Sequence, residues 1–114
     1  MSVELARKVC TPCRGGIPPL TQAEAVAYLA QVPHWELADE AGRIHRTYKF
    51  RNFGEALAFV QRVGTLAEAE AHHPEIAFGW GYATISLRTK KIKGLHENDF
   101  IMAAKIDELA NPVG

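Results

Sequence analysis

The segment that decides the fold is residues 52–74, which read NFGEALAFVQRVGTLAEAEAHHP. Asn52 and Glu55 are residue types that satisfy the unpaired backbone N–H groups at the start of a helix. Apolar residues then recur at helical spacing, and Pro74 disfavours helical geometry in the residue before it. The sequence therefore predicts one long helix from about residue 52 to residue 71, ending in a corner at two adjacent histidines.

Two apolar stripes run along this predicted helix. The stripe expected to cover a sheet consists of Phe53, Leu57, Val60, Gly64 and Ala67. The second stripe, on a neighbouring face, consists of Phe59, Val63 and Leu66. One core contact needs only one stripe, so we expect the second to pack against the same helix of another subunit.

The segments on either side of the long helix alternate between helix and strand patterns. Thr21 and Glu24 form a capping box that predicts a helix to about Gln31. Alternating residues 43–50 predict a strand that forms a hairpin with the short apolar segment 35–37. Further strands are predicted around 76–78 and 83–88, and a last helix covers 100–109. The order αββαββα predicts an α+β fold, a four-stranded antiparallel sheet with the helices packed on one face.

Length and charge limit what this domain can be. The chain has 114 residues, enough for one core. Residues 1–20 are predicted to form an irregular N-terminal arm, and residues 21–114 the domain itself. Thirteen basic and thirteen acidic side chains cancel, which argues against nucleic acid or an anionic membrane as the main partner. Without a long apolar run or a secretory signal, we expect a cytoplasmic protein.

The predicted arm contains a C-x-x-C pair, Cys10 and Cys13. Such a pair can be half of a zinc site or a redox couple. The sequence has no second pair and no βαβ pattern beside it, so we expect two reduced thiols and no metal. The alternative is a metal site completed by His34, His45 or a second subunit.

His72 and His73 carry the clearest chemical signal. An unperturbed imidazole titrates near pH ~6.5, so a pair of them can hold one proton donor and one acceptor at neutral pH. Glu68 lies one helical turn before His72, and we expect its carboxylate beside that imidazole. A histidine pair at the end of a helix can also be purely structural, because the helix dipole favours cations there.

Glu68-x3-His72-His73-Pro74, followed by Trp80 and by Asp99 before the terminal helix, resembles the pterin-4a-carbinolamine dehydratases, also called 4a-hydroxytetrahydrobiopterin dehydratases. The resemblance covers roughly residues 21–110 and includes the αββαββα order. It implies a dehydratase that converts 4a-hydroxytetrahydropterin to quinonoid dihydropterin plus water, without metal or organic cofactor. It also implies a homodimer or homotetramer, and animal members of the family act as transcriptional coactivators.

The resemblance assigns catalytic roles to His72, His73 and the position of Lys90. Dehydration needs a proton delivered to the departing hydroxyl and another removed from a ring nitrogen, and positioned acids and bases contribute about 10²–10⁴-fold each. The family has a third histidine where this chain has Lys90. A neutral imidazole can accept a proton, whereas a lysine cannot unless burial or a cationic neighbour such as Lys91 lowers its pKa, so this departure bears directly on activity.

Four further residues are expected to form the substrate-binding part of the site: Glu68, Pro74, Trp80 and Asp99. Each has a structural alternative. An acidic residue in the first turn of a helix, such as Asp99, is stabilising without any catalytic role. Trp80 can be core packing, and Lys90 with Lys91 can be a solvated strand end. We assign no function to His34, His45 or His96.

Two functions remain open from the sequence. The first is a pterin dehydratase acting on a small-molecule substrate, which the intact His72-His73-Pro74 favours. The second is a non-catalytic relative that acts as a protein-binding, coactivator or assembly factor, which Lys90 favours. Fold alone cannot decide between them, because function depends on the site.

Overall fold

The computed structural model describes residues 3–11 and 15–110. Along the chain the elements are α1 (Val3–Arg7), α2 (Gln22–Leu29), β1 (Glu36–Ala38), β2 (Arg43–Lys49), α3 (Phe53–Glu70), β3 (Glu75–Gly79), β4 (Tyr82–Leu87), the 3₁₀ helix η1 (Lys90–Ile92) and α4 (Glu97–Ala110). From α2 onward this is the αββαββα order predicted from the sequence, with η1 added before the last helix.

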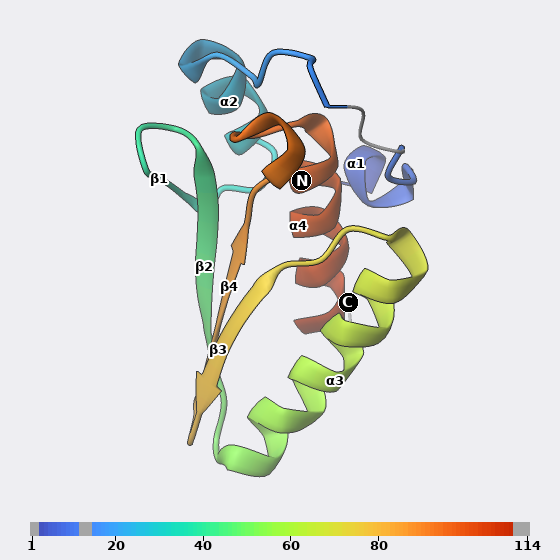
Figure 1. Ribbon diagram of the computed structural model, residues 1–114. Helices are drawn as coiled ribbons and strands as arrows, with labels where there is room; N and C mark the ends of the chain where they lie inside the picture. The colour runs from blue at the N-terminus through green and yellow to red at the C-terminus, as the bar shows by residue number, and fades with distance from the viewer. Residues whose placement is uncertain (1–2, 12–14, 111–114) are drawn as a thin grey trace.

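The four strands form one antiparallel sheet in the order β1-β2-β4-β3. Figure 1 shows α3 and α4 together on the same side of this sheet, with α2 near one end of it. Apolar side chains from the strands and helices meet between the two layers, and Trp35, Phe59 and Phe100 are among the largest that are fully buried. The α+β fold is therefore confirmed.

The two ends of α3 are set by local contacts. At its start the Asn52 side chain accepts a hydrogen bond from the Glu55 backbone N–H at 2.9 Å, as the sequence predicts. At its end Ala71 adopts a left-handed conformation with φ 53°, and the His72 N–H donates back to the Ala67 carbonyl at 3.2 Å. This backbone reversal resembles a Schellman motif, although glycine is the usual residue there.

The two apolar stripes of α3 do not divide between core and surface as predicted. The buried residues of the helix are Ala56, Phe59, Val63 and Ala67. Phe59 packs its ring 4.7 Å from that of Tyr48, measured between centroids, while Phe53 and Leu57 are exposed. Phe59 and Val63 are thus unavailable to a second subunit, and that prediction is wrong. Both stripes are apolar and helically spaced, so only the contact with the sheet distinguishes them.

A polar cluster ties the sheet to α4 at the inward-facing Arg46. One carboxylate oxygen of Asp107 accepts hydrogen bonds from Arg46 at 2.8 Å, from the Trp35 indole at 3.0 Å and from the Tyr48 hydroxyl at 2.5 Å. Burial, and then the Asp107 charge, raise the pKa of the Tyr48 phenol. The charged Arg46 can therefore face the helices because its partner lies on α4.

Part of the N-terminal segment is helical, where the sequence predicts an irregular arm. It contains α1, which packs against α4, and its Leu5 and Ala6 are buried. Cys13 lies outside the described residues, so the role of the C-x-x-C pair stays a prediction. Within residues 3–11 and 15–110 no group of three His, Cys, Asp or Glu side chains is arranged to hold a metal ion. No helix in the same part of the chain combines the length and apolar character needed to cross a membrane.

Candidate active site

The two adjacent histidines at the corner between α3 and β3, His72 and His73, lie in different environments. The side chain of His72 is only 10% exposed, whereas that of His73 is 61% exposed. The backbone reversal at Ala71 turns the chain out of the helix, and successive side chains leading into a strand point to opposite faces. The pair is therefore one buried imidazole and one exposed imidazole.

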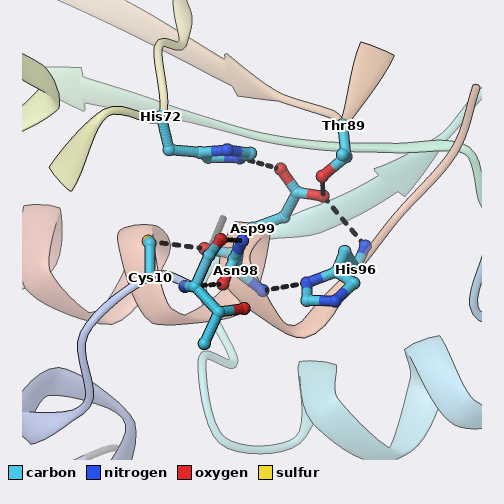
Figure 2. A network of polar contacts seen from close by, with 7 residues as sticks. Cys10, His72, Thr89, His96, Asn98 and Asp99 are labelled. Atoms are coloured by element: carbon cyan, nitrogen blue, oxygen red, sulfur yellow. Dashed lines mark hydrogen bonds and ion pairs between the residues drawn. The ribbon is translucent and has the colours of Figure 1, made fainter. Parts of the chain in front are cut away.

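Asp99 is the buried partner of His72. His72 Nε2 lies 2.7 Å from Asp99 Oδ1, and the side chain of Asp99 is fully buried. The other carboxylate oxygen, Oδ2, accepts hydrogen bonds from the Thr89 hydroxyl at 2.9 Å and from the His96 backbone N–H at 3.0 Å (Figure 2). Three partners compensate for the lost hydration of the carboxylate, which a buried charge requires.

The start of α4 holds Asp99 in this orientation. His96 precedes the helix, and its Nδ1 accepts a hydrogen bond from the Asn98 N–H at 3.0 Å. Because Asp99 in turn accepts from the His96 N–H, the two residues form the reciprocal arrangement of a capping box. A histidine in place of the usual Ser or Thr hides this pattern in the sequence, which is why His96 received no role there.

The exposed histidine has its own carboxylate. His73 Nε2 lies 2.5 Å from Glu68 Oε2, and both side chains are mostly exposed. The sequence places Glu68 beside His72, and that prediction is wrong, because the left-handed turn at Ala71 moves His72 inward. Glu68 and Asp99 therefore hold different imidazoles on the two sides of the corner.

Lys90 lies next to the buried pair but outside it. The preceding residue, Thr89, is buried and donates to Asp99, whereas Lys90 begins η1 and is exposed. Paired hydrogen bonds between the backbones of Thr89 and Gly94 close the loop that carries η1. Thr89 is thus a site residue that the sequence analysis missed. The one feature of the sequence that could have indicated it is its hydroxyl, next to Lys90 at the family's third histidine position.

Trp80 does not join the His72–Asp99 pair within one chain. It lies in the turn between β3 and β4 and is 72% exposed. Figure 1 shows that this turn is at the end of β3 remote from the α3–β3 corner where the histidines lie. Pro74 occupies the last position before β3. Of the four predicted substrate-binding residues, the structure thus brings Glu68, Pro74 and Asp99 to the corner.

The geometry suits proton transfer. Each of the two histidines has Nε2 against a carboxylate, which fixes its ring and leaves Nδ1 as the nitrogen that can exchange a proton with a ligand. A carboxylate that orients an imidazole in this way also stabilises the protonated ring that forms during acid–base catalysis. The corner therefore holds two oriented imidazoles that can act as acid or base. That of His72 is buried, and that of His73 is exposed to solvent.

Comparisons with known proteins identify the family. The family model described as pterin 4 alpha carbinolamine dehydratase matches residues 18–109. A protein of Cupriavidus pinatubonensis, provisionally named pterin-4-alpha-carbinolamine dehydratase 1, is 66% identical over 110 residues, which cover 96% of this chain and 95% of the relative. A provisionally named dehydratase of Methylococcus capsulatus is 61% identical over 106 residues, covering 93% of each chain.

Solved structures share the fold. A transcriptional coactivator/pterin dehydratase from Brucella melitensis matches with a TM-score of 0.76 and 30% identity, covering 81% of this chain and 98% of its own. A pterin dehydratase-like RuBisCO assembly factor of the alpha-carboxysome matches with a TM-score of 0.59 and 26% identity, covering 67% and 88%. The fold and the matching sequence define a lyase family, and this chain belongs to the pterin-4a-carbinolamine dehydratase family.

Proposed function

We propose that the protein dehydrates 4a-hydroxytetrahydropterin to quinonoid dihydropterin plus water, with His72 and His73 as the general acid and base. The observation that carries this proposal is the buried His72–Asp99 pair, 2.7 Å between Nε2 and Oδ1. The family resemblance marks His72 as catalytic and places Asp99 beside it in the substrate-binding part of the site. The proposal needs no cofactor and no metal, and it places the reaction in the cytoplasm.

The reaction is an elimination that moves protons without a redox step. The bond between C4a and the hydroxyl oxygen breaks, and an acid delivers a proton so that water leaves. A base removes the proton from a ring nitrogen, and the electron pair released forms the new carbon–nitrogen double bond. Two imidazoles with opposite protonation states can perform both transfers at neutral pH.

The remaining proposed site residues support these two groups. Asp99 and Glu68 orient the imidazoles, and Pro74 directs the chain into β3 so that the rings stay on opposite sides. Lys90, in the loop beside Thr89, is proposed to donate a hydrogen bond or proton to the pterin. Trp80 is proposed to contact substrate only if a second copy of the chain brings it to the site.

We also propose self-association as a homodimer or homotetramer, through a different surface from the one that the sequence indicates. Exposed Phe53 and Leu57 lie at the start of α3, where the Phe53 ring is 5.5 Å from that of Phe78 on β3, and the exposed Trp80 follows that strand. Leu57→Glu should therefore lower the mass measured by light scattering, whereas a wild-type monomer would contradict this part of the proposal.

A non-catalytic role in protein binding or assembly is the second candidate. Lys90 at the third histidine position favours it, as does the fold similarity to the RuBisCO assembly factor. This reading predicts that the protein adds nothing to the spontaneous dehydration of 4a-hydroxytetrahydropterin.

A dehydration assay separates the two candidates. Purified protein is added to enzymatically generated 4a-hydroxytetrahydropterin, and the loss of its absorbance is compared with the uncatalysed rate. Dehydratase function predicts a clear acceleration that falls at least about 10²-fold in His72→Ala, with His73→Ala lowering kcat or raising KM. Spontaneous rates in both wild type and His72→Ala would favour the protein-binding role.

A further inference from the structure

Residues 5–8 of the N-terminal arm are attached to α4 by both backbone and side-chain contacts. Lys105 Nζ on α4 donates to the Ala6 carbonyl at 2.8 Å and lies 3.8 Å from the Glu70 carboxylate. Lys8 pairs with Glu97, the first residue of α4, at 2.5 Å. With Leu5 and Ala6 buried beneath it, the segment has both apolar and polar anchors on the helix that carries Asp99.

Two consecutive arm residues reach the ends of both helices that form the site. The Cys10 N–H donates to Glu70 Oε1 at 2.8 Å, and Glu70 is the last residue of α3, two positions before His72. The Thr11 N–H donates to Asn98 Oδ1 at 3.0 Å, and Asn98 Nδ2 donates to the Thr11 carbonyl at 2.7 Å. Asn98 directly precedes Asp99.

The Asn98 side chain is built for this contact. It is 2% exposed, and both its amide nitrogen and its amide oxygen hydrogen-bond to the backbone of Thr11. A buried amide that loses its partners is costly, so the two hydrogen bonds oppose displacement of the arm. Because only the Thr11 backbone takes part in them, the identity of the Thr11 side chain should matter little.

Cys10 contributes through its position and not through reactivity. Burial, and then the nearby Glu70 carboxylate, raise the pKa of the Cys10 thiol from 9.0 to about 12. The thiol is therefore protonated at neutral pH, and its sulfur lies 3.7 Å from the Asn98 carbonyl. The segment of Cys10 and Thr11 behaves as a connector packed between α3 and α4.

We propose that Cys10 and Thr11, held by Glu70 and Asn98, form an N-terminal clamp that fixes the spacing between His72 and Asp99. Glu70 and Asn98 are then positioning residues that act through the ends of α3 and α4. A displacement of about 1 Å in a catalytic group can cost on the order of 10²-fold in rate. The kinetic readout of this inference rests on the proposed dehydratase function, but its structural readout does not.

The sharpest test compares Thr11→Pro with Thr11→Ala. Proline removes the N–H that donates to Asn98, whereas alanine keeps the backbone hydrogen bonds. We expect Thr11→Pro to lower kcat about 10-fold with KM within about twofold, and Thr11→Ala to match wild type. Glu70→Ala should likewise lower kcat, while Glu70→Gln, which keeps an acceptor for Cys10, should retain most of it.

The structural readout is the ¹⁵N NMR spectrum of the His72 ring, assigned with His72→Ala. A clamp that fixes the pair predicts one tautomer in wild type and Thr11→Ala, and averaged ring signals in Thr11→Pro and Asn98→Ala. If Asn98→Ala does not fold, Thr11→Pro decides, because it leaves the residues of the domain unchanged.

The possible failures can be told apart. Unchanged His72 signals and unchanged kcat in folded Thr11→Pro would overturn the clamp while leaving the dehydratase proposal intact. A wild type without dehydratase activity would end that proposal, and the ring signals would still decide the clamp.

Discussion

The inner and outer sides of the α3–β3 corner carry the same pair of groups in different surroundings. Inside, His72 meets the fully buried Asp99, which has two further partners; outside, His73 meets the exposed Glu68. An exposed ion pair contributes little, because water and salt screen it, whereas removing one member of a buried pair leaves an uncompensated polar group. Two adjacent histidines should therefore respond very differently to the same substitution in their partners.

The largest expected effect is on the Cys10 thiol, whose rate of alkylation should differ between folded and unfolded protein. Because the pKa of Cys10 is raised to about 12, the folded protein holds about 10³-fold less thiolate at pH 8 than a thiol of ordinary pKa 9.0. We expect iodoacetamide to alkylate Cys10 correspondingly slowly in a Cys13→Ser background, with the rate rising toward pH 12. Denaturation in urea should restore ordinary rates, and Glu70→Gln should raise the folded rate. Equal rates in folded and unfolded protein would mean that partial burial and Glu70 do not suppress the Cys10 thiolate.

Asp99→Ala should have a far larger effect than Glu68→Ala. Loss of Asp99 leaves His72, Thr89 and the His96 N–H without their acceptor, so we expect about 3 kcal/mol of destabilisation and at least a 10²-fold loss of turnover. Glu68→Ala should cost less than about 1 kcal/mol, because its pair is exposed. Urea denaturation and the dehydration assay measure both. Similar losses for the two variants would show that burial does not distinguish the pairs.

Lys90→His tests whether the site lacks a catalytic base because lysine replaces the family's third histidine. If the lysine replaces the family's histidine at a cost in rate, the variant should raise kcat several-fold near neutral pH and add a pH dependence close to that of imidazole. The measurement is kcat from pH 6 to pH 9 for both proteins. A fast wild type that Lys90→His slows would mean that lysine acts in its own right.

The smallest effect is expected at the turn that separates the two sides. Ala71 has φ 53°, a conformation that costs a residue with a Cβ about 1 kcal/mol relative to glycine. Ala71→Gly should relieve this strain, and part of the gain is lost to the greater freedom of glycine in the unfolded chain. We expect a net stabilisation of about 0.5 kcal/mol in urea denaturation. A destabilised variant would argue against strain at this position.

The sequence predicted the elements well, because their signals are local. The capping residues at Thr21 and Asn52, the alternation over 43–50 and the break at Pro74 each act within a few positions, and the structure agrees with all of them. One failure came where two local signals were equivalent. Phe59 and Leu57 lie on equally apolar stripes of α3, and only the packing of the sheet decided which stripe is buried.

The same distinction holds for the candidate site. His72, His73 and Asp99 could be singled out because the motif and its spacing are visible in the chain, and the family follows from them. His96 was missed because a histidine replaces the usual capping Ser or Thr, and Thr89 because only its contact with Asp99 gives it a role. Asn98 and the N-terminal clamp were missed because their contacts join segments far apart in the sequence. By itself the sequence determined the family and the residues that we propose for the proton chemistry. Only the tertiary structure decided that His72 is the buried histidine and that Asp99 is its partner, because burial and long-range pairing depend on how the whole chain packs.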